Sequence, residues 1–302
     1  MLKHLITGEE LSFGEITSLL TLAANLKKKG NGDTLLQGKH LALLFEKPSL
    51  RTRFSFTIAM HELGGHVVES LSETRKKEEP EDVARVLEGY CDAIMVRTHS
   101  DEILSRMGQV SKIPIINGLS DLHHPCQILA DLLTLQEVFG KLEGLKLTYI
   151  GDGNNILHSL LLLAPLIGVN LHYCCPKMCQ PNEEIVKQAS LRQAEGKGSI
   201  TICSTPLGAA KEAHAVYTDV WTSMGFENKI DESLFAGFQV NEQLMKHALP
   251  DAIFMHCLPM IRGKEVSQTL PDKPASVIFK QSENRLHIQK ALLIALILGD
   301  LL

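Results

Sequence analysis

The sequence predicts an α/β protein of two domains, each a mainly parallel sheet flanked by helices. Short apolar runs that suit buried strands alternate with amphipathic segments that suit helices. The order strand, tight turn, helix occurs at residues 41–63 and again at 145–167. A length of 302 residues also fits two domains. We expect a first domain of residues 1–139 plus 283–302, on which the C-terminal helix packs back, and a second domain of residues 145–282.

The elements of the first half follow from the spacing of apolar residues. Residues 71–82 are charged and lack any period, which predicts an exposed loop. Gly140 and Gly144 close the last helix, so 140–144 is the expected domain boundary. The predicted elements are helices at 8–29, 50–63, 83–90, 103–110 and 128–138, and strands at 41–45, 65–68, 93–97 and 114–117.

The second half repeats the pattern. Its predicted strands end in polar clusters, and ligands bind at the carboxyl ends of strands in open α/β sheets. The predicted elements are strands at 145–150, 171–174, 199–203, 215–219 and 253–256, a helix at 156–167 and a terminal helix from 283 onward.

The turn after the strand at 41–45 is a candidate anion site. Pro48 interrupts the chain, Ser49 stands at the expected helix N-cap, and Arg51 and Thr52 fall in the first helical turn. Free N–H groups, the helix dipole, hydroxyls and a guanidinium together suit a phosphate. A capped helix whose arginines pair with acids elsewhere explains the same residues equally well.

Composition excludes several classes of protein. A net charge of −5 with no dominant basic face argues against nucleic acid. Seven cysteines without a CxxC pair, and no secretory segment, favour a reducing cytoplasm. The apolar run 160–166 is too short to cross a membrane.

Metal and dinucleotide cofactors are not expected. His61 and His66 resemble a zinc HExxH motif, but they are five residues apart rather than four and diverge around a helix. The turn 151–155, GDGNN, lacks the glycine fingerprint of a dinucleotide site, which argues against a dehydrogenase.

Four motifs in register resemble the aspartate/ornithine carbamoyltransferase family, and the likeness runs from end to end. They are nearest to those of the ornithine-using members. The motifs are Ser49-Leu50-Arg51-Thr52-Arg53, His124-Pro125-Cys126-Gln127, Asp219 with Ser223-Met224-Gly225, and His256-Cys257-Leu258-Pro259.

The resemblance implies roles for individual residues. Catalytic roles fall to Arg97, His124, Cys257 and Arg285, with Cys257 orienting rather than attacking. The ornithine-binding set is Asn155, Asp219, Ser223 and Met224. The carbamoyl phosphate-binding set is Ser49, Leu50 (through its N–H), Arg51, Thr52, Arg97, His124, Gln127, Cys257, Leu258 and Arg285.

The implied reaction is transfer of the carbamoyl group of carbamoyl phosphate to the δ-amine of L-ornithine. Putrescine lacks the carboxylate that Ser223 and Met224 face in the family, and N-acylornithine would offer Asp219 no charged amine. A non-catalytic relative would have lost an arginine or histidine of the carbamoyl site, and all are present. The alternatives that remain are carbamoylation of putrescine, carbamoylation of an N-acylornithine, and a non-catalytic role.

Structural roles explain some of the same residues. His124 before a proline could cap a helix, Asp219 could be an N-cap, and Asn154 and Asn155 could form a turn. Arg53 is expected to brace the phosphate turn through a carboxylate.

The chain departs from the family at three places. Leu50 replaces a threonine, Ile261 replaces a histidine, and the loop 71–80 is shorter than usual. The family assembles as homotrimers or multiples of trimers, in which this loop helps to complete a neighbouring site. Lys76 and Lys77 are the candidates for that role.

Overall fold

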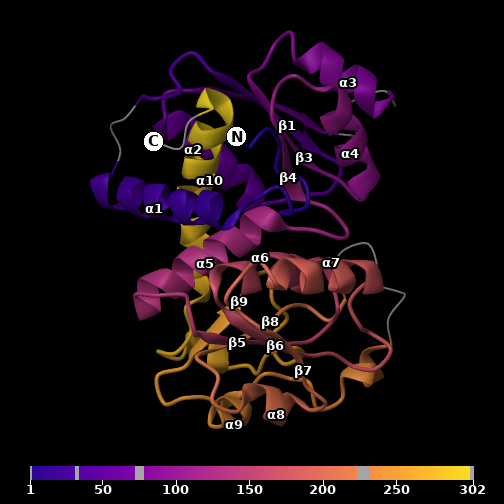
Figure 1. Ribbon diagram of the computed structural model, residues 1–302, viewed down its shortest axis with the longest axis vertical. Helices are drawn as coiled ribbons and strands as arrows, with labels where there is room; N and C mark the ends of the chain where they lie inside the picture. Colours follow the sequence, from indigo (N-terminus) through magenta and orange to yellow (C-terminus); the bar gives the residue numbers. More distant parts are fainter. Residues whose placement is uncertain (1, 31–33, 72–77, 223–230, 300–302) are drawn as a thin grey trace. The chain divides into compact units, whose positions relative to one another are not determined.

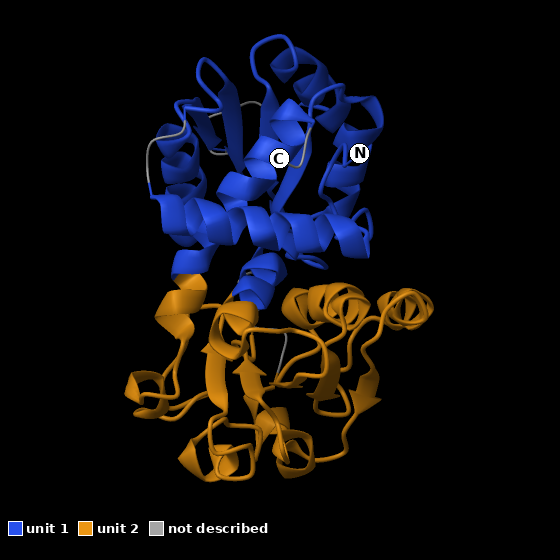
Figure 2. Cartoon of the chain, turned by 60° about the vertical axis from the view of Figure 1, so that its left-hand side comes forward, with its two compact units in different colours: residues 1–133, 283–302 blue, residues 134–282 orange. Residues whose placement is uncertain are grey.

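The computed structural model describes residues 2–30, 34–71, 78–222 and 231–299. The chain forms two compact units, residues Met1–Leu133 with Glu283–Leu302 (unit 1) and Thr134–Ser282 (unit 2) (Figure 2). The two divisions between these units fall inside the helices α5 (Pro125–Phe139) and α10 (Ile278–Leu298).

Unit 1 contains a four-stranded parallel sheet in the order β2-β1-β3-β4. In Figure 1, α3 and α4 lie on one side of this sheet, and α1, α2 and α10 lie on the other. Besides the unit 1 parts of α5 and α10, the elements are α1 (Phe13–Lys29), β1 (His40–Phe45), α2 (Arg51–Glu62), β2 (His66–Leu71), α3 (Pro80–Leu87), β3 (Ala93–Arg97), α4 (Asp101–Val110) and β4 (Ile115–Leu119).

Alternating strand residues build the core beneath α3 and α4. Successive side chains of a strand point to opposite faces, so every second residue of β1 and β3 enters the same layer. The buried set is Ala42, Leu44, Ala84, Ile94, Val96, Leu104, Met107 and Ile115. The expected α/β layering of the first domain is therefore confirmed.

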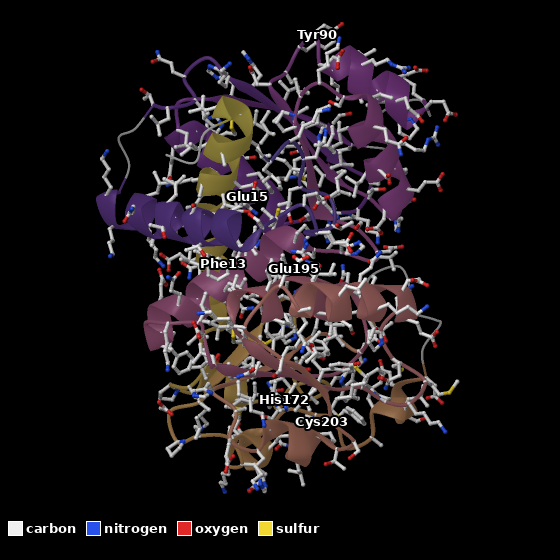
Figure 3. The ribbon with its side chains drawn as sticks, viewed as in Figure 1. Phe13, Glu15, Tyr90, His172, Glu195 and Cys203 are labelled. Atoms are coloured by element: carbon white, nitrogen blue, oxygen red, sulfur yellow. The ribbon has the colours of Figure 1, made fainter. Side chains whose placement is uncertain are left out.

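The first helix is fixed by its own sequence. Ser12 accepts a hydrogen bond from the N–H of Glu15, and the Glu15 carboxylate accepts one from the N–H of Ser12, which is a capping box. Figure 3 shows Glu15 beside the exposed Phe13 at the start of α1.

Unit 2 contains a five-stranded parallel sheet in the order β7-β6-β5-β8-β9. In Figure 1, α6 and α7 cover one face and α8 and α9 the other. The elements are β5 (Lys146–Ile150), α6 (Asn155–Leu163), η2 (Pro165–Ile167), β6 (Asn170–Cys174), α7 (Glu183–Gln193), β7 (Ile200–Ile202), α8 (Pro206–Ala210), β8 (Ala215–Thr218), η3 (Glu232–Phe235), α9 (Glu242–Met245), β9 (Ile253–His256) and η4 (Leu270–Asp272).

The C-terminal helix packs on unit 1, as expected. Arg285 of α10 bonds to Thr52, Lys27 of α1 bonds to Asn284, and Lys290 pairs with Glu62 of α2. The helix begins at Ile278, five residues before the predicted start. None of the described helices is both long enough and apolar enough to cross a bilayer.

Candidate functional site

The strand order places a switch point in each unit. From β1 the chain goes to β2 on one side and continues with β3 on the other, and β5 has the same relation to β6 and β8. In such sheets the loops at the carboxyl ends of the two central strands diverge and leave room for a ligand. The phosphate-turn candidates, Arg97, Asn155 and Asp219 follow or end these central strands, whereas His124 and Gln127 follow β4, Cys257 and Leu258 follow β9, and Arg285 lies in α10.

The turn that is predicted to bind phosphate follows β1 in unit 1. The first residue of α2 is Arg51 and its N-cap is Leu50, so the expectation that Ser49 is the N-cap is wrong by one residue. The Ser49 hydroxyl nevertheless accepts the N–H of Thr52 at 3.3 Å, because it lies three residues before it. The side chain of Leu50 is 67% exposed.

Thr52 is the centre of the unit 1 cluster. It is fully buried, and its Oγ1 accepts hydrogen bonds from Arg285 Nη2 at 2.9 Å and Arg97 Nη1 at 3.5 Å. Arg97 ends β3 and is buried as well. Burial, with the charges of Arg285 and Arg51, lowers the pKa of Arg97 to about 10. The crowding of these cations creates a strongly positive region.

His124 and Gln127 lie at the start of α5. Burial and the charges of Arg285, Arg97 and Arg51 hold the pKa of His124 well below its usual value, so the imidazole is neutral at neutral pH. Gln127 is buried and donates to Asp131 Oδ1 at 2.8 Å. Its Oε1 has no hydrogen-bond partner in the described part of the chain, which makes it an available acceptor.

Ion pairs and hydrogen bonds brace the loops that carry these residues. Lys47 Nζ lies 2.5 Å from Asp121 Oδ1, and Thr98 donates to Glu46 at 2.5 Å. Together they tie the loop after β1 to those after β3 and β4. The sequence gives no signal for these pairs, because their members are more than fifty residues apart.

Arg53 has the bracing role expected of it. It pairs with Glu69 of β2 at 2.6 Å, and its guanidinium lies over the ring of Phe45.

The unit 2 cluster centres on Asp219, which follows β8. Its Oδ2 accepts from Asn154 Nδ2 at 2.8 Å, and its Oδ1 accepts from Cys257 Sγ at 3.0 Å. Asn154 also caps α6, accepting from Ile156 N–H and Tyr149 OH. Asn154 therefore has two roles: its side chain shapes the turn before α6, as the sequence suggests, and it also orients Asp219.

Asp152 adds a second carboxyl group to unit 2. Burial and the nearby charge of Asp219 raise the pKa of Asp152 to about 7, so about half of this carboxyl group is protonated at neutral pH. Two acids in one partly desolvated region favour a cationic ligand. Sequence reasoning missed Asp152, although its GDGNN turn was singled out.

Asp219, His256 and Cys257 form the one group of three in the described residues with atoms near enough to hold a metal ion, within 4.8 Å of one another. Both ring nitrogens of His256 already bond elsewhere, Nδ1 to the N–H of Leu258 and Nε2 to Glu265. A metal ion bound by His256 would therefore have to replace one of these two hydrogen bonds.

Cys257 lies at a backbone turn of unusual conformation. Leu258 has φ 62°, in the left-handed region that costs an L residue about 1–2 kcal/mol. Cys257 and Leu258 belong to unit 2, whereas the other eight residues of the expected carbamoyl phosphate set belong to unit 1.

The remaining ornithine candidates are only partly described. Asn155 is buried as the first residue of α6, next to Asn154. Ser223 and Met224 lie outside the described residues, as do Lys76 and Lys77.

A second thiol–imidazole contact lies away from this cluster. Cys203 Sγ is 3.7 Å from His172 Nδ1, and Figure 3 shows both side chains in unit 2. Burial raises the pKa of Cys203, so the thiol is not activated as a nucleophile.

Two family models match nearly the whole chain. Residues 3–137 match the carbamoyl-P binding domain of aspartate/ornithine carbamoyltransferases, and residues 143–296 match their Asp/Orn binding domain.

Named relatives match over almost their full lengths. An ornithine carbamoyltransferase from Anoxybacillus flavithermus is 48% identical, covering 98% of this chain and 96% of its own. The structure of the Pyrococcus furiosus enzyme of that name has a TM-score of 0.93 at 43% identity, covering 99% of this chain and 97% of its own. The anabolic enzyme from Campylobacter jejuni has a TM-score of 0.93 at 38% identity, covering 99% of this chain and 100% of its own. The chain therefore belongs to the aspartate/ornithine carbamoyltransferase family.

Proposed function

We propose that the protein is an ornithine carbamoyltransferase, which converts carbamoyl phosphate and L-ornithine into L-citrulline and phosphate. The observation that carries the proposal is the buried Thr52 hydroxyl, which Arg97 and Arg285 bond beside a neutral His124. Thr52, Arg97 and His124 lie in the part of the chain that matches the family's carbamoyl-P binding domain. Relatives named anabolic support a role in arginine biosynthesis.

Unit 1 supplies the groups that carbamoyl phosphate requires. Ser49, Arg51, Thr52 and the N–H groups of the helix start, Leu50 among them, bind the phosphate, since a helix N-terminus and a guanidinium both favour a dianion. Arg97, Arg285 and His124 bind the carbamoyl oxygen. The free Oε1 of Gln127 accepts from the carbamoyl NH₂, and Asp131 holds the opposite side of that amide.

Unit 2 supplies groups for the amino acid. Asp219, fixed by Asn154 and Cys257, pairs with the α-ammonium of ornithine. Asn155, Ser223 and Met224 complete this set on the strength of the family motif. Cys257 donates its S–H to Asp219, which supports an orienting role rather than a nucleophilic one.

The reaction then proceeds by positioning and electrostatic stabilisation. The neutral δ-amine attacks the carbamoyl carbon, and the negative oxygen of the tetrahedral intermediate is stabilised by donors from Arg97, Arg285 and His124. One such donor contributes about 3 kcal/mol to lowering a barrier. Phosphate departs with the C–O bond electrons and takes the proton that the amine releases.

A substrate panel tests this proposal. Citrulline should form from L-ornithine and carbamoyl phosphate, while putrescine, L-aspartate and N-acetyl-L-ornithine give less than about 1% of that rate, because a mispaired buried charge costs several kcal/mol. Faster carbamoylation of one of the other amines would assign the enzyme to that amine. Binding of carbamoyl phosphate without any product would indicate a non-catalytic relative.

The functional domains that we propose are residues 1–139 with 283–302, and residues 145–282. The family models support this boundary, since one ends at residue 137 and the next begins at 143. The compact units support assigning the end of the chain to the first domain.

We also infer a homotrimer, or a multiple of trimers, in the cytoplasm. An exposed apolar row at the start of α2, formed by its N-cap Leu50 with Phe54 and Ile58, supports association, because exposed apolar patches mark interfaces. All seven cysteines are free, which supports a reducing compartment. Light scattering should give three times the chain mass of 33.3 kDa or a multiple of that, and Phe54→Glu should lower it.

A further inference from the structure

The turn between β4 and α5 is held by one carboxylate from a neighbouring loop. Asp101 is the first residue of α4, which follows β3, and β3 is the neighbour of β4 in the unit 1 sheet (Figure 1). Its Oδ1 accepts hydrogen bonds from Ser120 Oγ at 2.6 Å and from His123 Nδ1 at 2.7 Å. Its Oδ2 accepts the N–H of Leu122 at 3.0 Å. A single side chain thus holds three residues of the segment 120–123.

His123 is the residue that these hydrogen bonds fix most completely. Asp101 holds its ring, its N–H donates to Ser120 Oγ at 3.3 Å, and its carbonyl oxygen accepts the N–H of Ser120 at 2.9 Å. His124 is the next residue, and its own carbonyl oxygen accepts the N–H of Gln127 at the start of α5. The backbone of His124 is therefore held from both sides.

The hydrogen bonds to Asp101 are those of an ionised carboxylate. Burial by itself would raise the pKa of Asp101, but the hydrogen bonds from His123 and Ser120 outweigh it, and the pKa is lowered. Because a carboxylate can only accept, His123 Nδ1 carries the proton in their contact. Hydrogen bonds to a charged group are stronger than those between neutral groups, so the turn is held firmly.

Folding alone gives little reason for a polar network at this position. Asn117 and Ser120 have no exposed surface, and His123 is 6% exposed. Asn117 Nδ2 donates to Ser120 Oγ, whereas its Oδ1 has no hydrogen-bond partner in the described part of the chain. A buried polar atom without a partner costs about 1–3 kcal/mol, and apolar side chains of similar volume would pack at least as well. What hydrogen bonds add is direction, which fixes one conformation of the turn.

We propose that Asp101 and His123 are positioning residues for the reaction: Asp101 holds the ring of His123, and His123 sets the backbone of His124, whose imidazole donates to the carbamoyl oxygen. Neither Asp101 nor His123 touches the substrate in this arrangement. A catalytic donor has to be held within about 0.5 Å of its productive position, and a turn without such support does not hold it there. The inference rests on the proposed function, which gives His124 its place at the carbamoyl oxygen.

Two substitutions at position 123 separate the hydrogen bond from the volume of the side chain. His123→Asn keeps an N–H donor close to the position of Nδ1, whereas His123→Leu has a similar volume and no donor. We expect kcat for citrulline formation to fall about 30-fold in His123→Leu and less than about threefold in His123→Asn, because misplacing a catalytic group by about 1 Å costs up to about 100-fold. The dissociation constant of inorganic phosphate should stay within about twofold in both variants, since phosphate binds at the start of α2.

Asp92 provides the matched control for Asp101. Its carboxylate also accepts from a side chain and from the backbone, Lys39 Nζ at 2.9 Å and the N–H of His40 at 2.8 Å, but at the opposite end of the same sheet, where β1 begins. Asp101→Ala should lower kcat about 30-fold, as His123→Leu does. Asp92→Ala should lower Tm and leave kcat unchanged. This pair decides the question if the His123 variants do not fold.

A double variant tests whether Asp101 and His123 act through one contact. Asp101→Ala combined with His123→Leu should be about as slow as Asp101→Ala alone, because the contact can be lost only once. Independent effects would multiply to a loss of about 10³-fold in kcat.

The outcomes distinguish failure of this inference from failure of the proposed function. A wild-type enzyme that forms no citrulline would refute the proposed function, and with it the role given to His124. An active wild type would refute the positioning role alone in any of three cases: equal kcat in His123→Leu and His123→Asn, equal kcat in Asp101→Ala and Asp92→Ala, or multiplied losses in the double variant.

Discussion

In unit 1 the sheet diverges between β1 and β3, and in unit 2 between β5 and β8. Arginines collect at the first divergence, where Arg97 has a pKa lowered to about 10. Carboxyl groups collect at the second, where Asp152 has a pKa raised to about 7. Each shift is caused by burial together with a like charge.

The comparison shows how the same sheet topology can suit ligands of opposite charge. The sheet supplies a position at the carboxyl ends of its strands, and the loop residues decide the charge. In both units like charges lie close together in buried surroundings, so a ligand of opposite charge gains more there than it would on an open surface. Changing the like charges in one unit at a time tests this interpretation.

Arg97→Met should have the largest effect. It removes a donor to the developing negative oxygen, so kcat should fall about 10³-fold. It also relieves the repulsion with Arg285 and Arg51, so Tm should not fall. Citrulline assays and thermal melts measure both quantities.

Arg106→Met is the control for that substitution. Arg106 is a partly exposed arginine of α4 that pairs with Glu79 and Glu81, and its loss should leave kcat unchanged. A large drop in the Tm of Arg97→Met would show that the cation is needed for folding, which would contradict the interpretation of unit 1.

Asp152→Asn addresses unit 2 through pH. Between pH 4 and 7 native Asp152 holds a proton that the unfolded chain has released, so the free energy of unfolding falls as pH rises. The fall amounts to at most about 4 kcal/mol, at 1.36 kcal/mol per pKa unit. Asn cannot titrate, so this part of the pH dependence should vanish.

Urea titrations of the apoenzyme at pH 5, 6, 7 and 8 measure the difference between the two proteins. If the free energy of unfolding changes with pH equally in the two proteins, Asp152 is not the group that holds the proton. Adding ornithine at pH 7 should release up to about half a proton per site more from the wild type than from Asp152→Asn, because a bound ammonium favours the carboxylate.

Thr52→Val tests the contact on which the unit 1 cluster depends. Val is isosteric but leaves Arg97 and Arg285 without their shared acceptor, and a hydrogen bond to a charged group contributes about 1.5–3 kcal/mol. We expect kcat/KM for carbamoyl phosphate to fall about 30-fold, while KM for ornithine changes little. Thr98→Val, on the neighbouring loop, should cost less. An equal loss of kcat/KM in the two variants would contradict a special role for the hydroxyl of Thr52.

Cys257→Ser should have the smallest effect. The serine hydroxyl still donates to Asp219, so kcat should fall by about tenfold or less. A nucleophilic cysteine would instead lose several orders of magnitude. Steady-state kinetics with both substrates separate the two roles.

The sequence predicts the sheets better than the helix boundaries. Buried runs such as 93–97 contain too many consecutive apolar residues for a surface segment, so periodicity finds them. α3 was expected at 83–90 but begins at Pro80, because proline suits the first helical position. α7 was not predicted at all, since it is largely polar and buries only Ile185 and Ala189.

The site residues likewise fall into those that the sequence predicts and those that it does not. Residues that follow a strand within a recognisable motif, such as Arg97 or Asp219, can be found from the sequence. Their orienting partners cannot, because contacts such as Gln127–Asp131 and His256–Glu265 use residue types that are common everywhere. Asp152 was missed for a related reason: its altered pKa comes from Asp219, a residue distant in the sequence.

The crowded guanidiniums of unit 1 have a practical consequence for handling the protein. A cluster of cations that gains by binding a dianion does not distinguish sharply between substrate and buffer, so inorganic phosphate or sulfate should bind there. At a concentration a hundred times its dissociation constant, such an anion adds about 2.7 kcal/mol to the folded state. Melting temperatures recorded in phosphate would then describe the complex, and KM values measured there would contain a competitive inhibitor.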